Sequence, residues 1–373
     1  MNAPGKIVVF AGTRPEIIKV ASVVRELKRR NLPGLQVHFC FTGQHLELAL
    51  PFLKYFDIAP DSRLDLMVPG QSLGALTGRA ATQVDEFLAK LPSVRATLVQ
   101  GDTTTAFVAA LTSFYHELPV GHIEAGLRTS QVREPFPEEL NRRLITRMAA
   151  WHYAPTQRDY DVLLAEQIAP TRALITGNTG IDSLLWAAGQ NQAPDNAQVK
   201  RLQGRRFVLV TCHRRENIGE PLKNIVSALS TLARRYANVE FLLPVHKNPN
   251  IAGVVREGLK GLSNFHLTEP LEYHDLVWAM KNAELLLSDS GGIQEEAASL
   301  AKPVLVLRNE TERPDAVEYG TSILVGSTPS RITDVAGEFL AGGRKVVLKR
   351  AQPPYGDGRA AVKIVDHLIQ ALG

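Results

Sequence analysis

Short apolar runs alternate with longer segments of helical periodicity along the first 150 residues of the chain. The runs are rich in β-branched residues and each one comes before a helical segment, as in consecutive βαβ units. They are KIVVFAG before 17–30, QVHFCFTG before 46–56, ATLVQG before 103–116 and PVGHIEAG before 137–150. This order predicts an α/β fold built on a parallel sheet.

The same alternation starts again in the second half of the chain. Its apolar runs are RFVLVTCH, VEFLLPVH, NFHLTEP, AELLLSDSGG, KPVLVLRN and TSILVG. Before them, the strand RALITGN is followed by an unpatterned stretch, Gln190–Gln198, which is the candidate interdomain region. We therefore predict two Rossmann-like, doubly wound domains, 1–178 and 179–357, and a closing helix, 358–373, that can pack back on the first domain.

Composition indicates a globular protein of the cytoplasm. Hydrophobic residues make up 45% of the chain and charged residues 21%, and no apolar run is long enough for a bilayer span or a signal peptide. Cys40 and Cys212 stand far apart without metal-ligand spacing, which fits a reducing compartment. The net charge of +4 suits an anionic ligand, but charges of both signs are interspersed. We expect neither a nucleic-acid nor a membrane partner.

Polar residues gather where the predicted strands end. In the first half these are Arg14 and Lys19, Gln44 and His45, Asp102 and Glu124; in the second they are His213, His246 and the run SDSGG. Ligands of open parallel sheets bind beyond the carboxyl ends of the strands. The sequence therefore predicts one site in the cleft between the two domains.

The run SDSGGIQEEA is the clearest phosphate-binding signal. Ser290, Gly291 and Gly292 come between a strand and a helix, where glycines let the backbone approach a phosphate and the helix N-terminus supplies free N–H groups. Glu296 would then be placed to accept from ribose hydroxyls. A serine cap followed by a glycine turn is the alternative. The chain has neither a Gly-x-Gly-x-x-Gly fingerprint after a strand nor a Gly-Lys-Ser/Thr loop.

Basic residues mark two further strand ends. Arg14 and Lys19 in GTRPEIIK can face an anion or simply form a solvated helix start. His213, two residues beyond a buried strand, can donate to a diphosphate or protonate a leaving oxygen. A histidine bonded structurally within its loop is the alternative.

Asp102, Glu124 and Glu138 are the candidate acids. Asp102 can cap a helix, hold a metal or move a proton, and Glu138 can favour the dipole of a helix start. Glu124 ends a strand without opening an obvious helix. Carboxylates crowded at one site raise the pKa of at least one of them towards the range useful for acid–base catalysis.

Ten motifs between residues 12 and 320 resemble, in order, those of the non-hydrolysing UDP-N-acetylglucosamine 2-epimerase family. They are GTRPEIIK, TGQH, QGDTTT, HIEAGLRT, PFPEELNRR, TGNTGIDSL, HRRENIG, PVHKNPN, SDSGGIQEEA and RNETERPDAVEYG. The resemblance implies two domains of the glycosyltransferase-B type, a bacterial cytoplasmic homodimer and a role in polysaccharide synthesis.

The resemblance also implies a reaction. UDP is eliminated across C1 and C2 of the sugar to leave a 2-acetamidoglucal and is then added back with inverted C2, without NAD or metal. Asp102, Glu124 and Glu138 are then the candidates for moving the C2 proton, with His213 at the diphosphate. The implied substrate-binding residues are Arg14, Lys19, Ser290, Gly291, Gly292, Glu296 and Arg313.

Many bacterial members of the family also bind a second UDP-N-acetylglucosamine as an activator. Gln44, Gln71, Arg214 and His246 match that pocket. Two alternatives stay open: epimerisation of a related UDP-sugar, such as a 2,3-diacetamido uronic acid or a deoxy amino sugar, and sugar transfer by a glycosyltransferase of the same fold.

Overall fold

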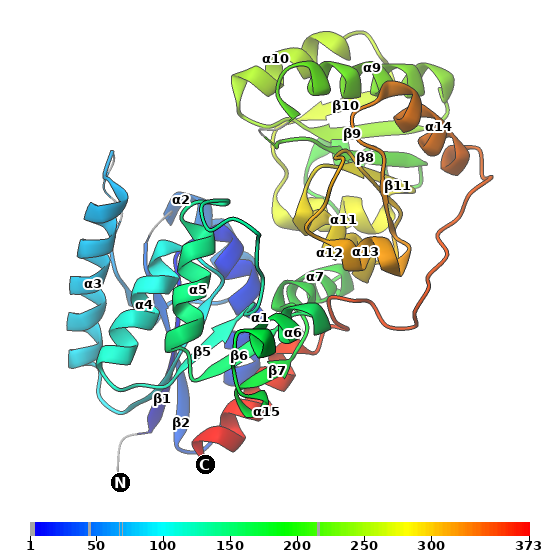
Figure 1. Ribbon diagram of the computed structural model, residues 1–373. Helices are drawn as coiled ribbons and strands as arrows, with labels where there is room; N and C mark the ends of the chain where they lie inside the picture. Colours follow the sequence, from blue (N-terminus) through cyan, green and yellow to red (C-terminus); the bar gives the residue numbers. More distant parts are fainter. Residues whose placement is uncertain (1–3, 44–45, 67, 69, 215–216) are drawn as a thin grey trace. The chain divides into compact units, whose positions relative to one another are not determined.

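The computed structural model describes residues 4–43, 46–66, 68, 70–214 and 217–373. The chain divides into two compact units, each with its own parallel sheet (Figure 1). The first unit contains Met1–Ser183 and Gly356–Gly373, and the second contains Leu184–Tyr355. The predictions of an α/β fold and of two parallel-sheet domains are confirmed.

Within its described residues, the sheet of the first unit has seven parallel strands in the order β3-β2-β1-β4-β5-β6-β7. The strands are β1 (Gly5–Ala11), β2 (Leu35–Phe41), β3 (Ser62–Arg63), β4 (Val94–Gln100), β5 (Val120–Ile123), β6 (Trp151–Ala154) and β7 (Ala173–Ile175). The helices are α1 (Arg14–Arg30), α2 (Leu46–Tyr55), α3 (Leu73–Lys90), α4 (Thr104–Tyr115), α5 (Glu138–Met148), α6 (Gln157–Ala165) and α15 (Ala360–Leu372).

Packing in the first unit explains why its central strands are continuous apolar runs. Helices α3, α4 and α5 lie side by side (Figure 1) and share a buried cluster with β1, β4 and β5. Val8 and Val99 are fully buried in that cluster. A strand in the middle of a parallel sheet is covered on both faces, so it needs apolar side chains in both directions.

Within its described residues, the second unit has a six-stranded parallel sheet in the order β10-β9-β8-β11-β12-β13. The strands are β8 (Phe207–Thr211), β9 (Glu240–Pro244), β10 (Phe265–Thr268), β11 (Leu285–Ser288), β12 (Val304–Val306) and β13 (Ser322–Leu324). The helices are α8 (Ala197–Lys200), α9 (Glu220–Arg235), α10 (Pro249–Gly258), α11 (Tyr273–Asn282), α12 (Gly291–Ser299), α13 (Pro314–Tyr319) and α14 (Pro329–Leu340). Helices α9, α10 and α14 pack on one face of this sheet and α11, α12 and α13 lie on the other (Figure 1).

The chain first passes between the units within helix α7 (Thr179–Gly189). The unpatterned stretch Gln190–Gln198 instead lies inside the second unit. Its backbone is fixed there because the buried Asp275 accepts from the N–H groups of Asp195 (2.7 Å) and Asn196 (3.2 Å). The polar stretch Gln190–Gln198 is therefore a loop anchored within the second unit. The chain passes from the first unit to the second before it, within α7.

The closing helix α15 packs against α1 of the first unit. Side chains of the first unit bind it: Arg30 pairs with Asp366 (2.7 Å), and the hydroxyl of Tyr153 lies 3.1 Å from Nδ1 of His367. The carboxylate of Asp182 caps its first turn by accepting from the N–H groups of Ala360 (3.1 Å) and Ala361 (2.7 Å). The C-terminal segment thus belongs to the first unit although it follows the second in sequence.

Candidate active site

Asp102 lies in the turn between β4 and α4. Gly101 before it adopts a left-handed conformation (φ 69°), and Thr103 after it is the N-cap residue, its hydroxyl accepting from the N–H of Ala106 (3.0 Å). The interpretation of Asp102 as the helix cap is therefore wrong. Its carboxylate instead pairs with Nη2 of Arg142 at 2.5 Å.

Burial and neighbouring charges act on the Asp102 carboxyl group in opposite directions. Burial raises the pKa of the Asp102 carboxyl, the Arg142 guanidinium opposes that rise and the nearby Glu124 adds to it. The side chain keeps 26% of its surface exposed, so a ligand can reach it. Across the described ranges, no group of three or more His, Cys, Asp or Glu side chains is arranged to hold a metal ion.

Glu124 follows the last residue of β5, as the sequence predicts, and opens no helix. Its φ of 68° is left-handed, a conformation that costs a non-glycine residue on the order of 1–3 kcal/mol and persists only where neighbours enforce it. Here the carboxylate accepts from Nζ of Lys19 at 2.5 Å and from Nε2 of Gln100 at 2.5 Å. Lys19 is thus bonded to a candidate acid and is not a solvated helix start.

Glu138 is the first residue of α5 and is half-buried. Within the part of the chain that the structure describes, its carboxylate makes no hydrogen bond or ion pair. The neighbouring Glu139 differs: it is fully buried and accepts from Nε of Arg143 (2.6 Å) and the N–H of Thr129 (3.0 Å). Glu139 is therefore structural, whereas Glu138 is available for a ligand.

Two other predicted ligand residues of the first unit make contacts with residues outside this acidic group. The guanidinium carbon of Arg14 is 4.7 Å from the ring centroid of Phe52, a cation–π contact. Gln71 accepts from Nη1 of Arg79 on α3. The structure therefore brings together Lys19, Asp102 and Glu124, with Glu138 one helical turn before Arg142.

His213 of the second unit is held by a buried aspartate. Asp289 is fully buried and accepts from the N–H groups of His213 (3.0 Å) and Arg214 (2.9 Å) and from Nδ2 of Asn217 (3.0 Å). Nδ1 of His213 lies 3.3 Å from the same carboxylate, and the ring stacks on that of His246 with centroids 6.1 Å apart. Burial lowers the pKa of His213.

The N-terminus of α12 fits an anion. Ser290 is the N-cap residue but its side chain forms no cap bond, and Gly291 and Gly292 are the first residues of the helix. Ser290 thus stands at the cap position, as the alternative interpretation has it, but does not cap the helix through its side chain. A Cβ atom at Gly291 would lie 3.7 Å from Nη2 of Arg214 and 3.8 Å from Cζ of Arg313. Two guanidinium groups beside free helical N–H groups make a site for a negatively charged group.

The guanidinium groups at this helix differ in their bonding. Arg313, the N-cap residue of α13, pairs with Glu295 of α12. Nε of Arg214 is buried and lacks a hydrogen-bond partner within the described residues. Glu296 is half-buried further along α12.

The predicted activator residues do not form one group within either unit. Arg214 lies beside Gly291, and His246 stacks on His213, so both adjoin residues predicted for the substrate. Gln71 belongs to the first unit, and Gln44 lies outside the described residues.

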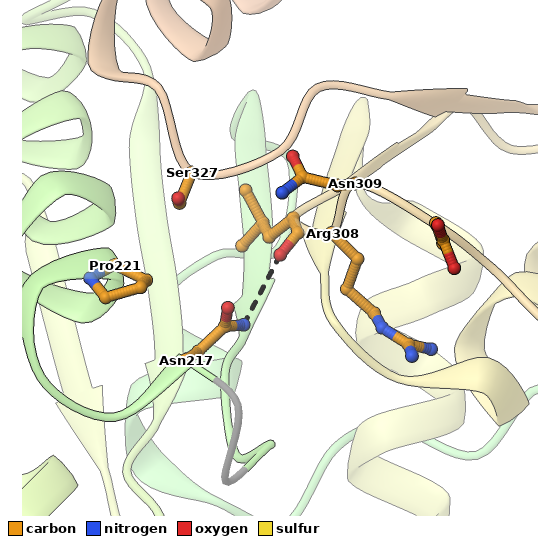
Figure 2. A pocket seen from close by; sticks show the side chains of 7 residues that line it. Asn217, Pro221, Arg308, Asn309 and Ser327 are labelled. Carbon is orange, nitrogen blue, oxygen red and sulfur yellow. Dashed lines mark hydrogen bonds between the residues drawn. The ribbon is translucent and has the colours of Figure 1, made fainter.

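A pocket of about 390 Å³ opens at the carboxyl ends of β8, β12 and β13 (Figure 2). It is lined by Asn217, Pro221, Leu307, Arg308, Asn309, Glu310 and Ser327. Figure 2 shows Asn309 and Ser327 opposite Asn217, whose Nδ2 donates to the carbonyl of Leu307 (3.3 Å). Asn217 also binds Asp289, so this pocket adjoins the loop that carries His213.

Sequence reasoning missed two charged residues of these groups, Arg142 and Asp289. Both stand inside quoted motifs, Arg142 in PFPEELNRR and Asp289 in SDSGG. The spacing of four residues puts Arg142 one helical turn after Glu138, but the acid that Arg142 pairs with, Asp102, stands 40 residues earlier in the chain and no local spacing marks it. Nothing in the sequence marks Asp289 as the acceptor for the His213 loop.

No helix of the described residues is long and apolar enough to cross a membrane. Comparison with known proteins shows extensive similarity. The family model of UDP-N-acetylglucosamine 2-epimerase matches residues 25–369. The UDP-N-acetylglucosamine 2-epimerase of Salmonella borreze is 43% identical over 373 aligned residues, covering 98% of both chains.

Solved structures agree with this. The Neisseria meningitidis UDP-GlcNAc 2-epimerase, bound to UDP-GlcNAc, is 39% identical with a TM-score of 0.84, covering 98% of this chain and 100% of that one. The glycotransferase of kitacinnamycin, at 12% identity and a TM-score of 0.63 over both full chains, shares only the fold. The fold is thus of the glycosyltransferase-B type. The chain belongs to the UDP-N-acetylglucosamine 2-epimerase family.

Proposed function

We propose that this chain interconverts UDP-N-acetylglucosamine and UDP-N-acetylmannosamine by inverting C2, without releasing the free sugar. The observation that carries the proposal is the pair of acids at adjacent strand ends, each held by its own cation. Asp102 pairs with Arg142, and Glu124 accepts from Lys19. Inversion at carbon needs a group that removes a proton and a group that returns one, and this pair supplies both.

The proposed reaction is an elimination followed by an addition. A carboxylate removes the C2 proton, the C–H electron pair forms the C1=C2 double bond, and the C1–O bond breaks to release UDP. In the second half, a carboxylic acid protonates C2 on the opposite face while a phosphate oxygen of UDP bonds to C1. C2–H is weakly acidic, so the barrier falls only when a base is already positioned and cations hold the departing diphosphate.

We assign the proton-transferring roles to Asp102, Glu124 and Glu138. Burial raises the pKa of Asp102, which helps it to hold and return a proton. Glu124 carries a bonded lysine and amide, which stabilise its ionised form and suit a base. Glu138 is the first residue of α5, and among the described residues its carboxylate makes no hydrogen bond or ion pair, so it is available to the substrate.

We assign the UDP part of the substrate to the second unit. Ser290, Gly291 and Gly292 offer helical N–H groups, and Arg214 and Arg313 lie beside them. His213, held by Asp289, is the proposed donor to the diphosphate, and Glu296 the acceptor for the ribose. Arg14 and Lys19 remain the proposed cations of the first unit.

We also propose an activating second UDP-sugar near Arg214 and His246, with Gln71 and Gln44.

The test is an NMR time course with UDP-N-acetylglucosamine in deuterated water, without added NAD or metal. The proposal expects deuterium at C2 and accumulation of UDP-N-acetylmannosamine. Free N-acetylmannosamine with UDP would instead identify a hydrolysing enzyme. If the substrate is unchanged, related UDP-uronic acids and deoxy amino sugars are tried next, and transfer to an acceptor after them.

A further inference from the structure

A buried histidine that the proposed chemistry does not use contacts the residue before Asp102. His122 on β5 is fully buried, and its Nε2 is 2.8 Å from the carbonyl oxygen of Gly101, the residue before Asp102. A carbonyl oxygen only accepts hydrogen bonds, so Nε2 carries a proton and donates. Burial lowers the pKa of His122 to about 4, so the ring is neutral and keeps this tautomer near pH 7.

The turn that carries Asp102 is held at three consecutive residues by side chains of three different elements. The carbonyl of Gly101 accepts from His122 of β5, and the carbonyl of Asp102 accepts from Nδ2 of Asn141 of α5 at 2.9 Å. The hydroxyl of Thr103 donates to Glu16 of α1 at 2.7 Å. These bonds fix the peptide groups on both sides of the Asp102 side chain.

The bond from His122 goes to Gly101, the residue of this turn with a left-handed backbone. Gly101 is buried and left-handed, and its carbonyl oxygen lies against the fully buried ring of His122. Loss of the donor would leave a buried acceptor unpaired, which the chain avoids by moving that peptide group. Any such movement passes directly to the next residue, Asp102.

His152 provides a comparison within the same sheet. It lies on β6 in register with His122, is equally buried, and burial lowers its pKa too, to about 3. Neither of its ring nitrogens has a hydrogen-bond partner in the described residues. The two histidines therefore share burial and size but differ in contact with the Asp102 turn.

We propose that His122 is a positioning residue for proton transfer at C2: its Nε2–H fixes the Gly101 carbonyl and thereby the place of the Asp102 carboxyl group. The inference rests on the proposed function. A displacement of about 1 Å at a reacting group can cost on the order of 100-fold in rate, so a bond that sets the position of Asp102 matters to turnover although it never touches substrate.

The test compares His122→Leu, His122→Gln and His152→Leu. The readouts are kcat and KM for UDP-N-acetylglucosamine, deuterium exchange at C2, UDP affinity and the unfolding temperature. We expect His122→Leu to lower kcat and C2 exchange roughly 10- to 100-fold with little change in KM or UDP affinity. Glutamine reaches as far as Nε2 and donates, so His122→Gln should restore much of kcat. His152→Leu should keep kcat.

The outcomes distinguish the possible failures. If His122→Leu keeps the wild-type kcat, or if His152→Leu loses as much kcat, the positioning role is wrong while the epimerase proposal stands. If the wild-type protein shows no C2 exchange with any UDP-sugar, the proposed function fails and this inference fails with it. Should His122→Leu not fold, His122→Asn replaces it, because the shorter amide cannot reach the Gly101 carbonyl; equal kcat in His122→Asn and His122→Gln would overturn the role.

Discussion

Asp102 is half-buried, paired with a single guanidinium and reachable by a ligand. Replacement by Asn keeps the shape and an oxygen that can accept from Arg142, but it removes the group that takes and returns a proton. We expect Asp102→Asn to lower kcat roughly 10²- to 10⁴-fold, the usual contribution of acid–base catalysis. UDP affinity, measured by calorimetry, should be unchanged. A variant that still exchanges the C2 proton at the wild-type rate would remove Asp102 from the chemistry.

Residue types and strand ends allowed most of the candidate acids and cations to be named from sequence, but not their pairing. Glu124 and Lys19 are 105 residues apart in sequence and Asp102 and Arg142 are 40 apart, so each pair forms only when the sheet aligns its strands. Glu139 shows that sequence position alone can mislead. It stands next to the candidate acid Glu138, yet it is fully buried and bonded in ion pairs. Contacts between residues far apart in the chain decide which acid is available to a ligand. The residues next to each acid in the sequence do not predict those contacts.

Helix α12 gives a prediction about UDP binding. A valine at Gly291 would place side-chain atoms where a phosphate approaches the helical N–H groups, between Arg214 and Arg313. Losing bonds to a charged ligand costs about 1.5–3 kcal/mol each, so Gly291→Val should weaken UDP binding roughly 10- to 100-fold. Calorimetry measures this directly. A Cβ atom at Gly253 on α10 would meet nothing within 4 Å, so Gly253→Val is the matched control that should bind UDP normally.

The cap of α15 gives a prediction about pH. Burial raises the pKa of Asp182 from 3.8 to about 6, although its bonds to the backbone of α15 act in the other direction. A raised pKa means that the folded protein holds this proton more tightly than the unfolded chain. The carboxyl group therefore contributes most to stability below about pH 3.8, and that contribution is lost as the pH rises through 6.

Asp182→Asn has no charge to titrate and loses one of the two accepting oxygens, so on top of a constant cost for that bond its stability relative to the wild type should rise between pH 4 and pH 7. The two pKa values differ by about two units, which corresponds to a gain of about 3 kcal/mol. Unfolding temperatures of both proteins, measured across this range, test the sign. A difference that does not vary with pH would contradict the assigned pKa.

Elements with strong apolar runs were predictable, whereas weakly patterned ones such as β6 and α3 were not. Strand β6, with the sequence WHYA, is short and contains a histidine, so its periodicity is weak. It is a strand because β5 and β7 pair with it on both sides. Helix α3 lies in a segment, LGALTGRAATQVDEFLAK, whose apolar stripe is narrow. Its buried Leu76, Ala80 and Val84 acquire their role only by packing on α4.

Several large apolar side chains are exposed on the surface of the single chain. Phe114 and Tyr115 end α4, and Leu140 and Leu144 lie one turn apart on the neighbouring α5; their exposed fractions run from 39% to 70%. Clustered exposed apolar side chains mark interaction surfaces more often than isolated ones do. We propose that a second copy of the chain covers this surface in the homodimer expected from the sequence.

Light scattering on the purified protein tests this proposal. The wild type should have twice the 40.9 kDa mass of one chain. Leu144→Glu places a charge on the proposed interface, and burying that charge unpaired is costly, so this variant should shift towards the monomer. Leu144 is already exposed, so the fold should tolerate the change. Val347→Glu, at a more exposed apolar residue of the second unit, is the control that should remain dimeric. A monomeric wild type, or a Leu144→Glu variant as dimeric as the control, would exclude this surface as the interface.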